Sequence, residues 1–213
     1  EIDNSNYDGQ ANYYGVMAIC GVGINGKKAY YSEEGANLWV CAHTQGNSGT
    51  GTTTAISTTD PSGSAGYNTN GSSNNFSNLS YNNRFNGTSS ATPLASGVIA
   101  LLLQANPNLG WRDVREIVAR SARKNDSTDS DWVTNGAGLS INHKYGFGTI
   151  DANAALTFAK TWTPLTGSQI VTSTVWQTNG GTAVAIPDNN TGGVSQNISV
   201  TSSGISSIEW VTL

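Results

Sequence analysis

Charged side chains are scarce in this sequence. Of its 213 residues, 10 are Lys or Arg and 14 are Asp or Glu, which gives a formal net charge of −4. The basic residues form no run longer than the pairs Lys27-Lys28 and Arg123-Lys124. Binding to nucleic acid requires a basic surface that neutralises phosphates. We therefore expect no nucleic-acid partner.

Long apolar runs and a secretory signal peptide are also lacking. The most apolar stretch, residues 94–103, is shorter than the roughly 20 residues that a membrane-spanning helix needs, and it follows a polar turn. We expect no membrane partner, and we expect the numbering to start inside a processed polypeptide. Gly, Ser, Thr and Asn are abundant. This composition is typical of a loop- and strand-rich secreted, extracellular protein.

The chain has only two cysteines, which is too few for a disulfide framework. Cys20 and Cys41 each lie in an apolar, strand-like run. They are either buried thiols or one bridge between two strands. We favour free thiols, because buried cysteine often behaves as a small hydrophobic residue.

The most informative stretch is NGTSSATPLASGVIALLLQ, residues 86–104. Gly87 allows a sharp turn, and the hydroxyls that follow it are good helix caps. Pro93 is tolerated only in a first turn, so the helix begins near Ser89, and its apolar remainder predicts burial. Unpaired N–H groups at that end favour a developing negative charge, as acyl transfer requires. The alternative is a capped core helix without chemistry.

The string GTSSATPLASGVIALLLQANPNLGWRDV, which starts at Gly87, resembles the nucleophile helix of subtilisin-like serine proteases, and within them the kexin and proprotein-convertase branch. The resemblance implies that Ser89 attacks the peptide carbonyl. The G-x-S-x-G elbow of other serine hydrolases is not met, because Ala91 stands where its second glycine belongs. The implied fold class is α/β, with a parallel sheet flanked by helices.

A serine nucleophile needs a base and a residue that orients the base. In subtilisin both precede the serine. Here only His43 precedes Ser89, at a position where the family has no catalytic histidine, and His143 follows it. The family's Gly-Asn-Gly turn, which carries the oxyanion asparagine, is absent. The resemblance implies the C-terminal half of a catalytic domain, whose partner is the N-terminal segment of the same protease.

Carboxylates near the N-terminus carry a second resemblance. The segment EIDNSNYDGQANYYGVMAI and the later Y-S-E triplet resemble convertase segments that bind calcium beneath the specificity pocket. The resemblance implies that Asp3 and Glu33 bind Ca²⁺, and that Asp8 faces the basic side chain before the scissile bond. Carboxylate oxygens suit both a hard cation and a Lys or Arg side chain.

Plainer alternatives exist for these carboxylates: Asp8 can belong to an Asp-Gly turn, and Glu33 can be a solvated charge beside Glu34. The cysteines that eukaryotic convertases place near the calcium ligands are replaced here by Ser5 and Gly35. A calcium site at this place must therefore be held without that bridge.

The rest of the chain predicts a mixed architecture. Gly21-x-Gly23-x-x-Gly26 matches a dinucleotide-binding pattern, but no apolar helix opens after it, so we expect a surface turn at Asn25-Gly26. The expected elements are strands at Tyr14–Gly23 and Leu38–Ala42, a long loop with an irregular hairpin at 45–80, a helix at 110–122, and a closing strand and helix at 143–156.

Residues 161–213 contain no Lys or Arg, and short apolar runs alternate with Ser and Thr. The runs QIVTSTVWQT, AVAIPDN, QNISVTS and SSIEWVTL predict successive β-strands. They resemble the start of the β-sandwich P domain of kexin-type proteases. We therefore expect a catalytic part at 1–159 and a partial P-domain-like β-sandwich at 160–213.

Together these features predict a serine endopeptidase that cleaves proteins or peptides after Lys or Arg through an acyl-enzyme on Ser89. The chain alone should be inactive, because its base lies upstream. The alternative is a catalytically inert fragment or a β-rich binding module.

Overall fold

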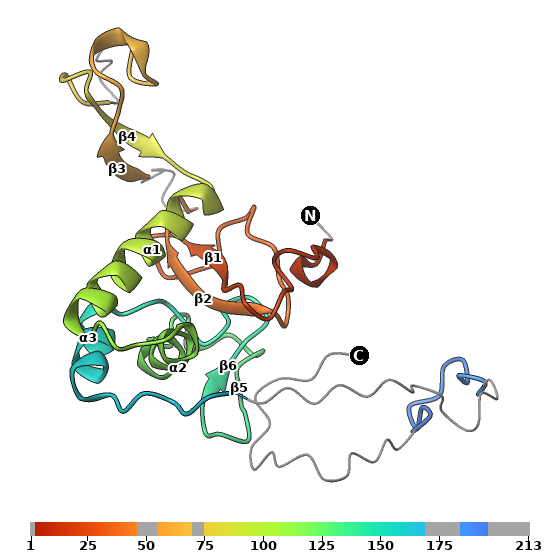
Figure 1. Ribbon diagram of the computed structural model, residues 1–213. Coiled ribbons are helices and arrows are strands. Elements are labelled where there is room, and N and C mark those ends of the chain that lie inside the picture. Colours follow the sequence, from red (N-terminus) through yellow and green to blue (C-terminus); the bar gives the residue numbers. More distant parts are fainter. Residues whose placement is uncertain (1–2, 47–54, 70–74, 169–183, 196–213) are drawn as a thin grey trace. The chain divides into compact units, whose positions relative to one another are not determined.

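The computed structural model describes residues 3–46, 55–69, 75–168 and 184–195. The chain divides into two compact units, Glu1–Leu165 and Thr166–Leu213. All helices and strands of the described residues lie in the first unit (Figure 1). The predicted boundary at 159/160 stays a prediction, although helix α3 (Ala152–Thr161) runs across it.

A pair of parallel strands forms the centre of the first unit. Strand β1 (Ala18–Val22) pairs with β2 (Leu38–His43), and both are almost entirely buried. Their apolar residues follow one another without strict alternation, as expected for strands covered on both faces. The predicted α/β class with parallel strands is confirmed for this part of the chain.

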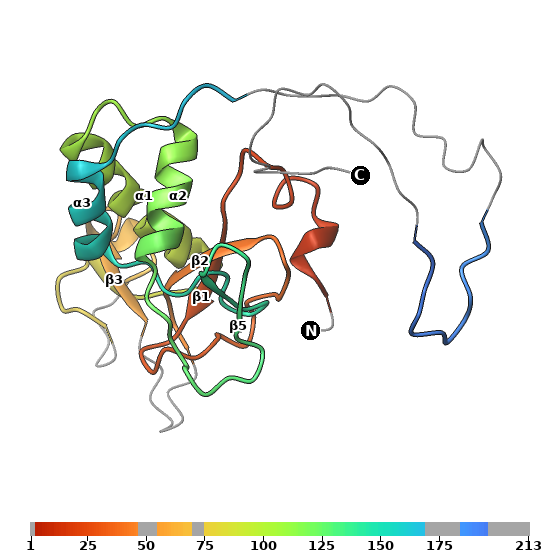
Figure 2. The same cartoon turned by 90° about the horizontal axis from the view of Figure 1, so that it is seen from below.

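Three helices cover one face of the β1–β2 pair (Figure 2). These are α1 (Thr88–Ala105), α2 (Trp111–Ser121) and α3 (Ala152–Thr161). Helix α1 packs on both strands, and α3 packs on α1 and α2. Their shared core consists of Val40, Leu102, Leu109, Val114, Ile117, Val118, Ala155 and Ala159. The shared core therefore holds α1 against the sheet.

The other face of the sheet is covered by loops around two short strands, β5 (Val133–Thr134) and β6 (Ser140–Ile141). Tyr145 is 2% exposed there and stacks on Trp132 at 5.8 Å between ring centroids. Burial and the hydrogen bond that Tyr145 donates to Asp126 raise the pKa of Tyr145 to about 12. This phenol is a structural group that stays protonated at physiological pH.

Two glycines let the loop of Tyr145 lie directly on the sheet. Gly146 has φ 57° and Gly148 has φ 124°. A Cβ at Gly146 would collide with the carbonyl of Trp39, and one at Gly148 with the carbonyl of Arg123. The backbone therefore approaches so closely at these two positions that only glycine fits.

The expectation of free thiols is wrong. Cys20 and Cys41 are register partners in the β1–β2 pair, with Cα atoms 4.2 Å apart, and they form a disulfide. Neighbouring strands place such a pair within bonding distance. The sequence shows two apolar runs but not that they lie side by side in this register.

The expected burial of α1 is only partly right. Leu101 is 46% exposed and Leu103 is 41% exposed, so two leucines that flank the buried Leu102 have no full cover in the described part of the chain. Among the described helices, α1 is long and apolar enough to cross a membrane by length and composition. It nevertheless packs on the sheet as a core helix does, and the absence of a membrane partner stays a prediction.

The predicted irregular hairpin is present. Strand β3 (Ile56–Thr59) pairs antiparallel with β4 (Tyr81–Phe85), and the register shifts within the pair. Its link contains the short 3-10 helix η2 (Gly63–Ala65). The buried Asn68 side chain fastens the hairpin by donating to the carbonyls of Phe76, Asn78 and Tyr81. Figure 1 shows this hairpin at the N-terminal end of α1.

The second unit is described over residues 166–168 and 184–195, where the chain forms turns and no strand. The strand predicted at AVAIPDN is therefore not seen over 184–189. Pro187 lacks an N–H, and a strand without a paired neighbour leaves its backbone groups unpaired. The strands predicted at QIVTSTVWQT, QNISVTS and SSIEWVTL lie outside the described residues.

Candidate active site

Ser89 lies in the first turn of α1. The helix begins at Thr88, and the capping residue Gly87 has φ 76° and ψ 173°, a conformation open essentially to glycine alone. Ser89 is exposed. Its hydroxyl has no hydrogen-bond partner among the residues that the structure describes. The first N–H groups of an α-helix lack the usual intrahelical acceptor. Here the Ser90 N–H donates to the Gly87 carbonyl at 3.1 Å, and the N–H groups of Thr88 and Ser89 have no acceptor among the described residues.

Ser90 is adjacent in sequence and differs in its surroundings. It is 2% exposed, and its hydroxyl donates to the Gly87 carbonyl at 3.0 Å. Its oxygen also lies 2.7 Å from the hydroxyl oxygen of Thr44. A buried hydroxyl that is already bonded in this way cannot reach a substrate, so the site has a single accessible serine at this turn.

The turn before Ser89 is held by two residues that the sequence analysis missed. The Gly87 carbonyl accepts from Thr44 at 2.7 Å, and the Gly87 N–H donates to the Tyr31 hydroxyl at 3.2 Å. The sequence signals were that Tyr31 is the first residue of the Y-S-E triplet, and that Thr44 directly follows an apolar strand. Neither signal says that these residues meet the turn.

Small side chains bring α1 close to the end of β2. Ala42 packs against Ala91 and Ala95, and all three are at most 1% exposed. This contact places the start of α1 at the carboxyl end of β2. Sites in α/β folds typically form at the carboxyl ends of parallel strands.

Neither histidine is bonded to Ser89 in the described part of the chain. His43 ends β2, between Ala42 and Thr44, and strand alternation turns it away from the face that those two residues present to α1. The ring Nδ1 of His143 lies 3.1 Å from the carboxylate of Asp131 instead. His143 follows β6, and Figure 1 shows β6 well away from the start of α1.

The segments that carry Asp3 and Glu33 run side by side. Asn4 and Glu34 form a parallel bridge, and the Ser5 N–H donates to the Glu34 carbonyl at 2.9 Å. The Glu33 carboxylate has no partner among the described residues. In this part of the chain no three His, Cys, Asp or Glu side chains gather in a metal-binding group.

A hydrogen-bonded clamp joins these segments where convertases have cysteines. The Ser5 hydroxyl donates to Asn37 Oδ1 at 2.6 Å, and Asn37 Nδ2 donates to the Ser5 carbonyl at 3.1 Å. Gly35 lies so close that a Cβ there would collide with the Ser5 hydroxyl. The segments are held without a disulfide.

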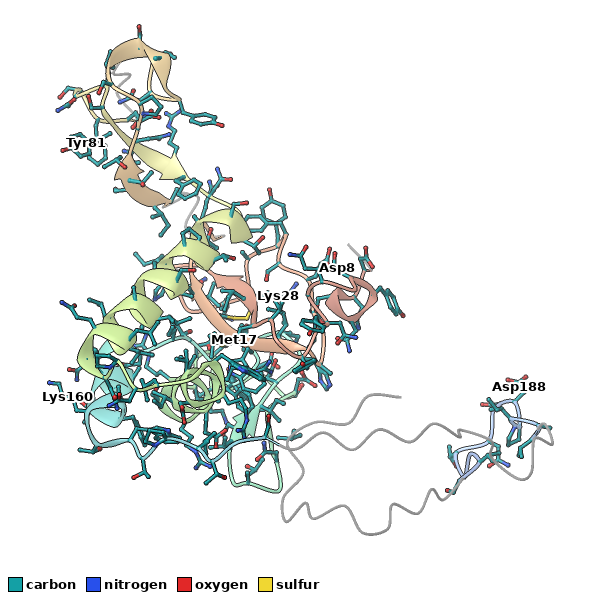
Figure 3. The ribbon with its side chains drawn as sticks, viewed as in Figure 1. Asp8, Met17, Lys28, Tyr81, Lys160 and Asp188 are labelled. Atoms are coloured by element: carbon teal, nitrogen blue, oxygen red, sulfur yellow. A yellow bond between two sulfur atoms is a disulfide. The ribbon has the colours of Figure 1, made fainter. Side chains whose placement is uncertain are left out.

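Asp8 follows the short 3-10 helix η1 (Ser5–Tyr7) and is exposed (Figure 3). Its Oδ1 accepts from the Gln10 N–H at 2.9 Å and from the Ala11 N–H at 2.7 Å. One carboxylate oxygen therefore caps an Asp-Gly turn, which was the plainer alternative. The structure does not bring Asp8 into a narrow pocket within the described residues.

The subtilase family model matches residues 2–148. The chain is 34% identical over 160 residues to PC3-like endoprotease variant B of Hydra vulgaris, which is 75% of this chain and 20% of the relative. It is 36% identical over 161 residues to proprotein convertase subtilisin/kexin type 7 of Homo sapiens, which is 76% of this chain and 19% of that relative. The chain spans about a fifth of the length of these relatives.

Solved structures agree with this match. The serine protease of Aeromonas sobria, crystallised with a chaperone, superposes with a TM-score of 0.71 at 33% identity over 83% of this chain and 35% of that chain. A protease of Pseudoalteromonas arctica superposes with a TM-score of 0.52 at 28% identity over 74% of this chain and 40% of that chain. The chain therefore belongs to the subtilase family, in its kexin and proprotein-convertase branch.

Proposed function

We propose that this chain supplies the nucleophile of a secreted serine endopeptidase that cleaves proteins or peptides after Lys or Arg. The observation that carries the proposal is the pairing of an exposed, unbonded Ser89 with a helix N-terminus directly behind it. An exposed hydroxyl beside unpaired N–H donors is what acyl transfer needs.

In the proposed reaction, Ser89 Oγ attacks the carbonyl carbon of the scissile peptide bond. Its proton passes to a base on the upstream segment, and the carbonyl oxygen takes up negative charge near the start of α1. Collapse of this intermediate breaks the C–N bond, and the base returns the proton to the leaving amine. Water then attacks the acyl-enzyme and restores the Ser89 hydroxyl.

The N-terminal segment of the same protease is the proposed partner of this chain. Two observations support it: the described residues hold no base bonded to Ser89, and the chain spans about a fifth of its relatives' length.

Calcium is the proposed ion for Asp3 and Glu33. Hard carboxylate oxygens suit Ca²⁺, and the parallel Asn4–Glu34 bridge carries the two residues on neighbouring segments. Calcium takes six to eight oxygen ligands, so these two carboxylates need further oxygens from water or from the upstream segment. When bound, the ion would neutralise this acidic corner and stabilise the two segments.

Asp8 is the proposed recognition group for a substrate Lys or Arg. It is an exposed carboxylate with one oxygen, Oδ2, left over from the turn that it caps. That oxygen can accept from a guanidinium or an ammonium group. A pocket around it must be completed by protein outside the described residues.

Secretion and a P-domain-like second unit complete the proposal. The Cys20–Cys41 disulfide supports an oxidising compartment, where such bonds persist. The separate compact unit at Thr166–Leu213 supports a second domain after the catalytic part. The alternative, an inert fragment or a β-rich binding module, would retain both features but would lack chemistry at Ser89.

A comparison of the 213-residue chain with the full-length protease tests the proposal. We expect the full-length protein to cleave Arg-containing peptides and to label with a fluorophosphonate at Ser89, identified by peptide mass spectrometry. The isolated chain should do neither, because a serine without its base is a weak nucleophile. A full-length protein without labelling at Ser89 would favour the inert alternative. Fast labelling of the isolated chain would point to a local base.

A further inference from the structure

We propose that Tyr31 and Thr44 are positioning residues for the nucleophile. Their hydroxyls hold the peptide groups of Gly87 and so set the place of Ser89. This inference rests on the proposed function, because it concerns the reaction that Ser89 performs.

The geometry is a closed set of hydrogen bonds around one glycine. The Gly87 N–H donates to the Tyr31 hydroxyl at 3.2 Å, and the Gly87 carbonyl accepts from Thr44 at 2.7 Å and from Ser90 at 3.0 Å. The Tyr31 and Thr44 oxygens lie 2.9 Å apart. Both backbone polar groups of Gly87 are thereby satisfied by side-chain hydroxyls.

These hydroxyls connect the turn to the sheet. The Thr44 N–H donates to the Val22 carbonyl at 2.9 Å, so the residue is tied to the end of β1. The Tyr31 hydroxyl also donates to the Gln45 carbonyl, directly after Thr44. Thr44 is 3% exposed, and Tyr31 is half-buried. The position of the turn is therefore set by β1 and β2, and not by α1 alone.

Gly87 needs such support because of its backbone conformation. Its φ of 76° and ψ of 173° lie in a sparsely populated region, and residues in such regions persist when their surroundings over-determine them. Removing the Tyr31 hydroxyl leaves the Gly87 N–H without its partner. Removing the Thr44 hydroxyl takes away the shortest bond to the Gly87 carbonyl, which keeps only the bonds from the Ser90 hydroxyl and N–H, and lets the turn relax. Ser89 is two residues further on, so its Oγ moves with the turn.

Displacement of a nucleophile by about 1 Å can cost roughly 100-fold in rate. Thr44 is buried, so we expect it to affect kcat rather than substrate binding. Neither hydroxyl is the base, so the pH at which kcat/KM is half-maximal should not move. This combination separates a positioning role from loss of the base and from general destabilisation.

The test uses the full-length protease with Tyr31→Phe and Thr44→Val, which remove one hydroxyl each and keep the side-chain size. We expect kcat and the rate of fluorophosphonate inactivation to fall roughly ten- to a hundredfold, with KM within about twofold of wild type. Thr44→Ser restores the hydroxyl and should recover most of the rate. Tm is measured alongside, and rates are taken well below it.

Tyr30→Phe is the matched control. Tyr30 is 71% exposed, its ring contacts that of Tyr31 at 4.9 Å between centroids, and its hydroxyl has no partner in the described part of the chain. We expect wild-type kcat from this variant. A loss as large as that of Tyr31→Phe would show that the aromatic pair matters and the hydroxyl does not, which would overturn the inference.

Failure of this inference and failure of the proposed function would give different results. Wild-type activity that depends on Ser89 but is unchanged in Tyr31→Phe and Thr44→Val would overturn this inference and leave the proposed function intact. A full-length enzyme whose activity and labelling survive Ser89→Ala would overturn the proposed function and this inference together.

Discussion

Ser89 and Ser90 are neighbours in the chain with opposite surroundings. Ser89 is exposed and its hydroxyl is unbonded within the described residues, whereas Ser90 is 2% exposed and bonds both Gly87 and Thr44. The first turn of α1 thus separates a serine that can react from one that holds the turn in place.

This difference predicts unequal effects of two substitutions in the full-length protease. Ser89→Ala should abolish peptide cleavage and fluorophosphonate labelling, since removing the nucleophile of subtilisin costs a factor of roughly 10⁶ in kcat. Ser90→Ala should keep labelling at Ser89 and lose roughly tenfold in kcat, because Gly87 retains its bond from Thr44. Steady-state kinetics and mass spectrometry of the labelled peptide measure both effects.

Ser96→Ala is the control for this pair. Ser96 is an exposed α1 residue whose hydroxyl donates to the Thr92 carbonyl at 3.1 Å. We expect wild-type kinetics from it. Labelling of Ser90 in the wild type or in Ser89→Ala would show that Ser90, and not Ser89, is the nucleophile.

The calcium proposal predicts an ion-dependent Tm in the full-length protein. An ion that binds only the folded state adds about 3 kcal/mol at about 100 times its Kd. Asp3→Ala and Glu33→Ala should each largely remove the rise in Tm on calcium addition, because each takes away a carboxylate ligand. Differential scanning calorimetry with calcium and with chelator gives the measurement.

Glu34→Gln serves as the matched control for Glu33. Glu34 is the next residue along the chain, and its carboxylate lies 3.5 Å from the Lys28 ammonium. Its substitution should leave the calcium-induced rise in Tm intact. An equal rise in wild type, Asp3→Ala and Glu33→Ala would place the ion elsewhere.

The specificity proposal predicts a change in substrate choice for Asp8→Asn. An Asn Oδ1 can still accept from the Gln10 and Ala11 N–H groups, so the turn should persist while the charge is lost. The ratio of kcat/KM for Arg over Leu peptides should fall by roughly two to three powers of ten, because a carboxylate pairs with a cationic side chain and an amide does not. Profiling on a peptide library measures the ratio.

Asp60→Asn is its matched control. The Asp60 carboxylate also accepts from backbone N–H groups, those of Tyr67 and Asn68, but it lies on the hairpin. We expect an unchanged Arg/Leu ratio from this variant. If Asp8→Asn also leaves the ratio unchanged, Asp8 is a turn residue only.

The stability of the loops around β5 and β6, which contain Asp129 and Lys144, should depend on pH. Lys144 Nζ donates to Asp129 Oδ2 at 2.7 Å, and this bond, together with those from the Asp131 N–H and the Asn142 side chain, lowers the pKa of Asp129 to about 2. A carboxyl whose folded pKa is lowered stabilises the fold above its unfolded pKa, and that stability is lost as pH falls from about 4 to about 2. The free energy of unfolding should therefore drop across this window.

Asp129→Asn and Lys144→Met should both reduce that drop, since each removes one partner of the pair. Denaturant unfolding of the full-length protein at several pH values measures it. A drop of wild-type size in both variants would show that other carboxyls carry the acid sensitivity of the fold.

Local patterns in the sequence were enough to identify strands β1 and β2, the three helices and the family. The apolar runs at β1 and β2, the glycine and proline around Ser89, and the periodicity of α2 are properties of neighbouring residues. Local backbone preferences and burial act over such distances. For that reason the turn at Gly87 and the start of α1 followed from the chain alone.

Only the tertiary structure decided which distant residues meet. The register of β1 with β2 pairs Cys20 with Cys41, and the packing of Ala42 on α1 brings Thr44 to Gly87. These contacts depend on how separate segments align in space, and a shift of one residue in a strand turns each side chain to the opposite face. The sequence determined that Ser89 lies in the first turn of a helix, and the fold decided which hydroxyls hold that turn in place.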